Sequence, residues 1–219
     1  MSTDDWKELS KANIRLLPKY GHHQKTERQK EMDEEFINST MSQEQFKGDR
    51  KAASNHLMEL GFTYLYRGDA KTAMYRYNQA YLLDSTNTEV YWGYGAFFMT
   101  IGNYSQAAEQ YKEGLSIDPK NTHLLTDHGT YFMAQYYAIT PIDEKGALSQ
   151  LDSAITYLAS SYSYDSTDMN TAYKLSICYW LKGECDSAWR YYDACKALGG
   201  KPITEDYTKD LKKSCKRRK

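Results

Sequence analysis

The feature that most constrains this sequence is a set of small and aromatic residues that recurs every 34 positions. Gly61, Gly95 and Gly129 are separated by 34 residues each. The same spacing of 34 separates four further pairs, which are Gly68 and Gly102, Ala73 and Ala107, Tyr77 and Tyr111, and Asp84 and Asp118. A fixed period of about 20 to 50 residues predicts stacked structural units, each of which buries its apolar face against the next unit.

The order of residues inside each unit is typical of two antiparallel helices. The first copy is Leu57-x-x-Leu60-Gly61-x-x-Tyr64, then Ala73-x-x-x-Tyr77, and the second is Tyr91-x-x-Tyr94-Gly95-x-x-Phe98, then Ala107-x-x-x-Tyr111, closed by Pro119. Glycine and alanine remove side-chain bulk where two helices approach, and the aromatic rings fill the space beside them. The chain has only 13 Gly and 4 Pro in 219 residues, which favours an all-α fold.

This pattern resembles the tetratricopeptide repeat (TPR), a helix-turn-helix unit, over about residues 54 to 200. The resemblance implies a right-handed α-solenoid of about four units, at about 54-87, 88-121, 122-161 and 169-200. Gly129 and Ala147 mark the third copy, in which six residues are inserted and after which seven more follow, and Ala188 marks the fourth. Residues 1-53 form an N-terminal non-repeat segment, and residues 201-219 form a capping helix and a basic tail.

The spacing predicts helices at about 54-67, 71-84, 88-101, 105-118, 122-138, 141-159, 169-182 and 186-197. Thr140 and Pro141 suit a helix start, because proline is favoured in the first turn. The serines from Ser160 to Ser166 predict a loop. Thr204 is the expected cap of the last helix, which we place at about 204-215. Glu27 to Phe36 favours a helix, and Ser42 to Lys51 is expected to lead into the first repeat.

The resemblance implies that the first helices of successive pairs line a concave groove. Carried over position by position, the partner-facing residues are Met58, Phe62, Tyr66, Glu89, Trp92, Met99, Tyr173 and Trp180. Met58 and Phe62 stand where relatives that clamp a carboxylate have Lys and Asn, so that kind of clamp is not expected. An apolar, aromatic groove of this kind is typical of a site for a partner helix or extended peptide.

Two interpretations of the groove stay open at this stage. A partner occupies it, or residues 1-53 or the long helix of the third repeat fill it and its side chains are core. If it is open, Trp92→Ala should weaken partner capture with little loss of stability.

Charge and motifs argue against several other functions. The 28 Lys and Arg against 29 Asp and Glu give no global field for nucleic acid, and no apolar run has the roughly 18 residues of a membrane span. His123, Asp127 and His128 superficially suggest metal ligands. His123 and Asp127 share a helix face at i, i+4, but no third ligand at informative spacing accompanies them, so we expect no metal or cofactor there. We therefore expect a non-catalytic protein-binding scaffold. The alternatives are a cytosolic co-chaperone-like adaptor, or an enzyme with an unrecognised site near His123 and His128.

The four cysteines all lie late in the chain. If the last helix stacks like the first helix of another repeat, Cys185 and Cys215 come together as a disulfide, with Cys178 and Cys195 as a weaker second pair. Clustered cysteines suit an oxidising compartment, and idle thiols in a cytosolic helical protein also fit. The tyrosine and cysteine usage resembles exported TPR proteins, which favours a periplasmic or secreted location, although residues 1-5 do not form a signal peptide.

Overall fold

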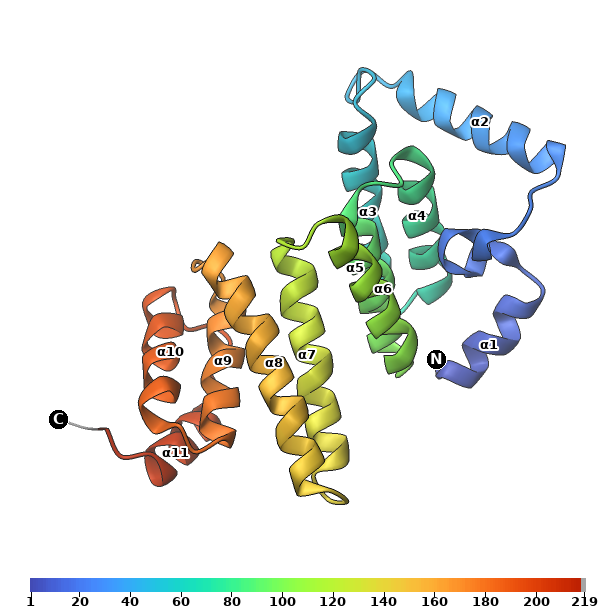
Figure 1. Ribbon diagram of the computed structural model, residues 1–219. Helices are drawn as coiled ribbons and strands as arrows, with labels where there is room; N and C mark the ends of the chain where they lie inside the picture. The colour runs from blue at the N-terminus through green and yellow to red at the C-terminus, as the bar shows by residue number, and fades with distance from the viewer. Residues whose placement is uncertain (218–219) are drawn as a thin grey trace. The chain divides into compact units, whose positions relative to one another are not determined.

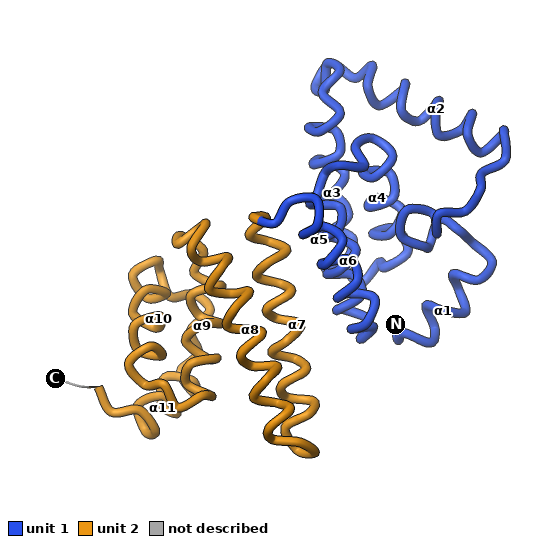
Figure 2. Tube along the Cα trace, in the orientation of Figure 1, with its two compact units in different colours: residues 1–119 blue, residues 120–219 orange. Residues whose placement is uncertain are grey.

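A computed structural model describes residues 1–217, and within this range the regular elements are eleven α-helices and two short 3-10 helices, with no strand (Figure 1). The all-α prediction is confirmed. The chain divides into two compact units, Met1–Pro119 and Lys120–Lys219, which we describe separately (Figure 2).

Unit 1 consists of an N-terminal segment followed along the chain by two repeat pairs. That segment comprises α1 (Thr3–Lys11), η1 (Ile14–Leu16), η2 (Pro18–His22) and α2 (Glu27–Met41). The pairs are α3 (Arg50–Tyr66) with α4 (Ala70–Leu83), and α5 (Thr88–Thr100) with α6 (Tyr104–Ile117). Unit 2 holds α7 (Thr122–Ile139) with α8 (Glu144–Tyr164), α9 (Met169–Leu181) with α10 (Cys185–Ala197), and α11 (Glu205–Ser214).

Side-chain caps set where the repeat helices begin. Asp69, Asn103 and Asn121 each accept a hydrogen bond from a backbone N–H of the first turn, which satisfies a donor that has no partner inside the helix. Asp49 does the same for α3, so α3 begins at Arg50 and is longer than the predicted 54-67.

Glycines set where the first helix of each pair ends. Gly68 and Gly102 have φ values of +81° and +77°, the left-handed conformation that ends a helix without a Cβ clash. A similar turn at Gly183, with φ of +75°, ends α9.

The third pair differs from the prediction at both ends of its second helix. Asp143 caps α8, which begins at Glu144, while Pro141 lies in the preceding turn, so the predicted start at 141 is wrong. The helix continues to Tyr164, and Ser160 and Ser163 turn their hydroxyls back onto backbone carbonyls of the same helix. The predicted loop is therefore mostly helix. The inserted residues lengthen the pair, since α7 has 18 residues and α8 has 21, against 13 in α5 and 14 in α6.

The recurring small residues lie where helices cross. Built on the backbone, a Cβ at Gly61 would overlap the ring of Tyr77, and one at Gly95 would overlap the ring of Tyr111. At Gly129 the facing side chain is Leu158, whose Cγ would lie 2.7 Å from such a Cβ. The alanines at the matching positions of the second helices are fully buried, namely Ala73, Ala107, Ala147 and Ala188. Of the aromatic repeat positions, Phe98 is buried and Tyr64 is half-buried.

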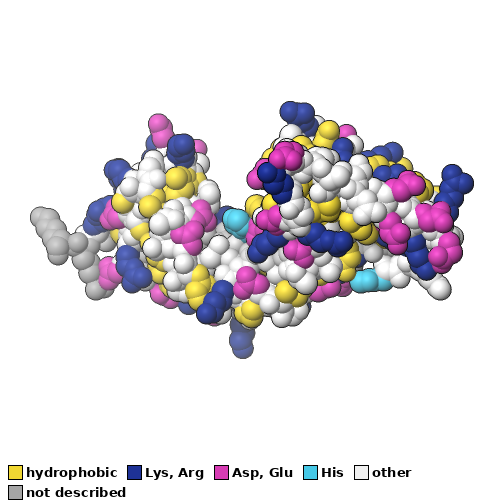
Figure 3. All heavy atoms as spheres, turned by 90° about the horizontal axis from the view of Figure 1, so that it is seen from above, with side chains coloured by type: hydrophobic (Ala, Val, Ile, Leu, Met, Phe, Trp, Pro, Cys, Tyr) yellow, Lys and Arg dark blue, Asp and Glu magenta, His cyan; other side chains and the backbone are white. Residues whose placement is uncertain are grey.

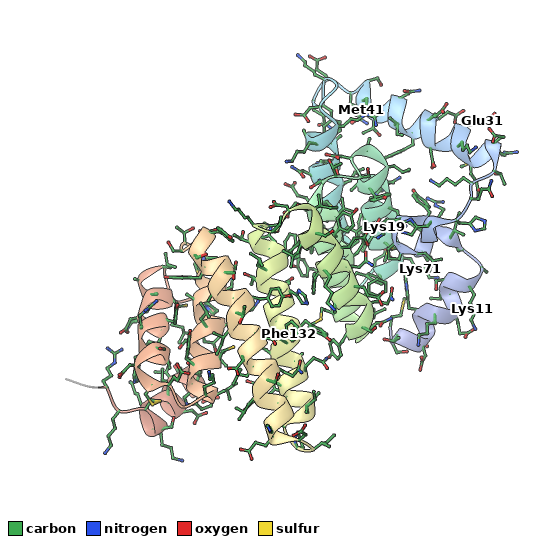
Figure 4. The ribbon with its side chains drawn as sticks, in the orientation of Figure 1. Lys11, Lys19, Glu31, Met41, Lys71 and Phe132 are labelled. Atoms are coloured by element: carbon green, nitrogen blue, oxygen red, sulfur yellow. A yellow bond between two sulfur atoms is a disulfide. The ribbon has the colours of Figure 1, made fainter. Side chains whose placement is uncertain are left out.

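The N-terminal segment packs onto unit 1 through a buried amide. Asn78 of α4 donates to the carbonyls of Arg15 and Leu17 at 2.9 Å each and accepts from the backbone N–H of Lys19 at 2.9 Å. The Nζ of Lys19 pairs with Glu113 of α6, and Figure 4 shows Lys19 beside α4. The helix α1, which the sequence did not predict, is capped by Ser2, and turns and a bend over residues 42–48 lead from α2 into α3.

The C-terminal helix α11 covers the last repeat pair of unit 2. Tyr207 and Leu211 are buried against Ala188, Trp189 and Tyr192. The hydroxyls of Tyr207 and Ser176 lie 2.6 Å apart. In the fourth copy Ser176 stands at the position that is glycine in the other three, and its hydroxyl hydrogen-bonds with the capping helix. Cys185 and Cys215 form a disulfide beside this cap. Cys178 and Cys195 are buried free thiols, so the second pairing is wrong.

One face of the described surface carries side chains of both signs of charge. On the face shown in Figure 3, basic and acidic side chains are interspersed over the described part of each unit. No helix within residues 1–217 combines the length and the apolar character that crossing a membrane requires.

Candidate partner-binding face

The predicted groove residues of unit 1 form a cluster of rings on α3 and α5. The rings of Phe62 and Trp92 lie 4.3 Å apart between centroids, and those of Phe62 and Tyr66 lie 6.0 Å apart. Phe62 and Tyr66 are four residues apart on α3, so they share one helix face. We call Phe62, Tyr66 and Trp92 the aromatic face.

Exposure increases along the aromatic face. Phe62 and Trp92 are half-buried, whereas Tyr66 is 82% exposed. Glu89 and Met99, the other predicted groove residues of α5, are also half-buried. An exposed ring beside two partly exposed ones is the kind of surface that large amphipathic side chains offer to a partner.

Met58 lies beneath this surface instead of on it. It is 3% exposed, and a Cβ added at Gly93 would overlap its terminal methyl group. Because Gly93 has no side chain, Met58 inserts between α3 and α5. The prediction that Met58 faces a partner is therefore wrong, and its role is in the core.

A fully buried tyrosine ring lies beneath the aromatic face. Tyr77 of α4 is fully buried, and its ring lies edge-on to Phe62 at 5.6 Å. A Cβ at Gly93 would lie 2.8 Å from this ring, so Tyr77 fills the space left by glycines on both α3 and α5. Burial raises the pKa of the Tyr77 phenol, which stays neutral in the folded protein.

The two predicted groove residues of unit 2 pack against its own capping helix. Tyr173 and Trp180 place their rings 5.4 and 5.6 Å from the ring of Tyr207. The indole Nε1 of Trp180 also donates to Ser214 Oγ at 2.7 Å. Because both side chains pack against α11, Tyr173 and Trp180 are not part of the candidate face.

The contacts of residues 1–22 lie elsewhere on unit 1. Trp6 packs on Phe97 with centroids 4.5 Å apart, and Thr3 donates to the carbonyl of Ile101 at 2.9 Å. Asn13 and Asn78 hold the segment to α4. Tyr66 stays exposed in the presence of this segment, so the aromatic face is uncovered there.

Asn78 is the residue of this arrangement that sequence reasoning missed. Its signal is a departure between the two strong copies, because Asn78 follows the repeat tyrosine where the second copy has Lys112, 34 positions later. The amide is fully buried and the lysine is exposed. In this chain the departure from the repeat coincides with the place where the N-terminal segment packs on α4.

The polar side chains of the His123 region lie in different environments. His123 is exposed, while His128 is fully buried, with its ring 4.2 Å from that of Tyr157. Asp127 lies 3.8 Å from Lys174. No group of three or more His, Cys, Asp or Glu side chains within residues 1–217 is arranged to hold a metal ion.

Comparison with known proteins identifies the fold. No protein-family model matches the sequence, and no curated protein matches it by sequence. Among solved structures, TTC0263, a thermophilic TPR protein from Thermus thermophilus, has 17% identity and a TM-score of 0.60, with 74% of this chain and 80% of that chain covered.

Two further structures resemble this chain. MamA has 17% identity and a TM-score of 0.52, over 82% of this chain and 98% of that chain. BtubC from P. vanneervenii has 16% identity and a TM-score of 0.53, over 86% and 83%. These likenesses show a shared fold, so the chain has the tetratricopeptide-repeat solenoid fold that its 34-residue period predicted.

Proposed function

We propose that this protein is a non-catalytic scaffold that binds a partner peptide or helix on the aromatic face of α3 and α5. The TPR fold supports protein binding in general. The observation that carries the specific proposal is Tyr66, which is 82% exposed and lies next to Phe62 and Trp92 on the side of the helices that such repeats use for partners.

The chemistry of the face favours an apolar partner segment. Aromatic rings supply large contact area at a low cost in conformational entropy, and truncating such an anchor typically costs about 2 kcal/mol or more of binding free energy, roughly a 30-fold loss of affinity. An amphipathic helix or an extended chain with spaced apolar side chains fits a surface of this kind. We propose no reaction for it.

The test compares two tyrosine truncations. Partners captured from an extract of the source cells are identified with the full chain as bait, and the affinity of each purified partner is then measured for Tyr66→Ala and for Tyr104→Ala. Tyr104 begins α6, is 41% exposed and lies outside the aromatic face. We expect at least tenfold weaker binding for Tyr66→Ala and no change for Tyr104→Ala, with both variants as stable as the parent. Equal affinity in both variants would remove the aromatic face as the binding site.

A further inference from the structure

A second site lies in unit 1, away from the aromatic face. A cavity of about 250 Å³ opens between residues 14–25, α2 and α4. Its apolar wall is formed by Ile14, Tyr20, Met32, Phe36 and Leu82. Met32 on α2 is 58% exposed although it lines the cavity, so an apolar wall here faces solvent. For scale, a dry cavity of about 150 Å³ accepts benzene.

The cavity lining has two positively charged side chains and one negatively charged side chain. Lys25 and Asp33 pair with each other, and Lys25 also lies 3.8 Å from the ring centroid of Tyr20. Arg15 lines the same cavity, and its guanidinium makes no ion pair with any residue of the described chain. It rests over the ring of Tyr75 at 4.5 Å, and Arg15 is exposed, so its N–H donors face solvent. The cavity therefore has an apolar wall and one positive charge that pairs with no carboxylate of the described chain.

The wall residue Tyr20 is held in an unfavourable backbone conformation. Lys19, Tyr20 and His22 have φ values of +55°, +56° and +52°. This left-handed region costs a residue with a Cβ roughly 1 to 2 kcal/mol. Asn78 and Tyr94 offset the cost by accepting hydrogen bonds from the N–H of Lys19 at 2.9 and 3.1 Å. The turn directs Tyr20 into the cavity wall, and its phenol makes no hydrogen bond with another residue of the described chain.

We propose that this cavity binds a small carboxylate that carries one apolar group, with the carboxylate on Arg15 and the apolar group against Ile14, Phe36 and Leu82. A guanidinium fork matches a carboxylate in shape and charge, and the unused phenol of Tyr20 supplies a further donor. The cavity holds a group of about the size of a phenylalanine side chain. The carboxylate belongs to a free small acid or to the C-terminus of a peptide, and the test separates the two.

The probes are 3-phenylpropionate and its neutral amide, 3-phenylpropionamide, which differ only in charge. Binding is followed by two-dimensional amide NMR of the full chain. A ligand of this size reaches a Kd of about 1 mM or tighter. We expect saturable shifts confined to residues 14–36 and 79–82, with the acid binding at least fivefold tighter than the amide. Equal binding of acid and amide, or shifts scattered over the chain, would overturn the proposal.

Variants test the role of Arg15 directly. Arg15→Gln should remove the preference for the acid over the amide, while Arg28→Gln on α2, which takes away the same charge outside the cavity lining, should retain it. Met32→Trp places a larger ring on an exposed wall position and should block both probes without unfolding the chain. Undiminished acid preference in Arg15→Gln contradicts the assignment.

A third probe, N-acetyl-Ala-Ala-Phe with a free C-terminus, identifies the source of the carboxylate. Tighter binding of this peptide than of 3-phenylpropionate, lost when its C-terminus is amidated, assigns the cavity to a peptide end. Tighter binding of 3-phenylpropionate assigns it to a free acid.

Discussion

The ring of Tyr77 occupies the space that any side chain at Gly61 would need. Tyr77 is fully buried, and the two residues lie on the paired helices α3 and α4. The same relationship recurs one period later between Tyr111 and Gly95. The helices of these two pairs approach closely because a glycine on one receives a ring from the other.

The first prediction concerns this interlock. Gly61→Ala should lower the free energy of unfolding by about 1 to 2 kcal/mol, because overpacking against the Tyr77 ring, which typically costs up to about 3 kcal/mol, outweighs the gain of about 1 kcal/mol in helix propensity. Urea denaturation followed by circular dichroism measures the change. Thr63→Ala is the control, since Thr63 is exposed on the same helix and should stay within about 0.5 kcal/mol of the parent. A Gly61→Ala protein as stable as the parent would contradict the interlock.

The second prediction concerns Asn78. Asn78→Leu removes two hydrogen bonds donated to the carbonyls of Arg15 and Leu17, and it removes the buried oxygen that accepts from the Lys19 N–H. The loss should cost about 3 kcal/mol, because buried polar groups lose partners that an apolar side chain cannot replace. Residues 1–22 should then become sensitive to limited proteolysis while α3 to α6 stay protected. The control, Lys71→Leu, changes an exposed residue of the same helix. Protection of the N-terminal segment in Asn78→Leu would show that the segment is held by other contacts.

The sequence predicted the parts of the fold that repeat. Gly61, Gly95 and Gly129 lie at equivalent helix crossings, because a side chain at any of the three would overlap the paired helix. Since the same requirement returns in each copy, glycine recurs at a constant spacing and is visible in the sequence. The predicted start of α8 was wrong, since the interpretation of Thr140 and Pro141 was local and the repeat places the cap later. Asp143 lies four residues before Ala147, as the caps Asp69 and Asn103 lie four residues before the repeat alanines of α4 and α6. The positions of residues 1–53 were not predictable, because that segment has no second copy in the chain with which to compare it.

The candidate face was predictable only in outline. Carrying repeat positions over identified Phe62, Tyr66 and Trp92 as neighbours. The repeat positions did not predict that Met58 is buried, because its burial depends on the absence of a side chain at Gly93, and this glycine is present in one copy only. Trp92 also touches Phe62 closely, so Trp92→Ala removes packing as well as surface, and Tyr66 is the cleaner probe of binding.

The third prediction concerns the disulfide between Cys185 and Cys215. The bond closes a loop with a sequence separation of 30 residues, and cross-linking a loop of that size stabilises a fold by about 3 to 4 kcal/mol. Reduction should lower the urea midpoint of the parent by a corresponding amount. The double variant Cys185→Ala/Cys215→Ala, as a control, should not respond to reductant. A parent insensitive to reductant, with four alkylatable thiols after unfolding without reductant, would show that the bond does not form in solution.

The last prediction concerns stability at alkaline pH. Burial raises the pKa of the Cys178 thiol to about 12 from an ordinary value of 9.0, and burial also raises the pKa values of the Tyr94 and Tyr207 phenols. These groups are neutral in the folded protein and ionise more readily when it unfolds. Their contribution to stability is complete below the unfolded pKa values, about 9 for the thiol and about 10 for the phenols, and is lost as the pH rises toward the folded values.

Urea midpoints should therefore be flat from about pH 7 to 8.5 and fall from about pH 9.5 to 11. Each of these groups can remove up to about 1.4 kcal/mol per pH unit once its unfolded form is ionised. Cys178→Ala should flatten the fall between about pH 9 and 10, before the phenols contribute.

Native protein at about pH 8 should also leave Cys178 unmodified by iodoacetamide, because the thiolate is the reactive form and the thiol is fully buried. Stability that stays constant to about pH 11, or rapid alkylation of Cys178 in the folded chain, would show that the thiol is not enclosed between α9 and its neighbours.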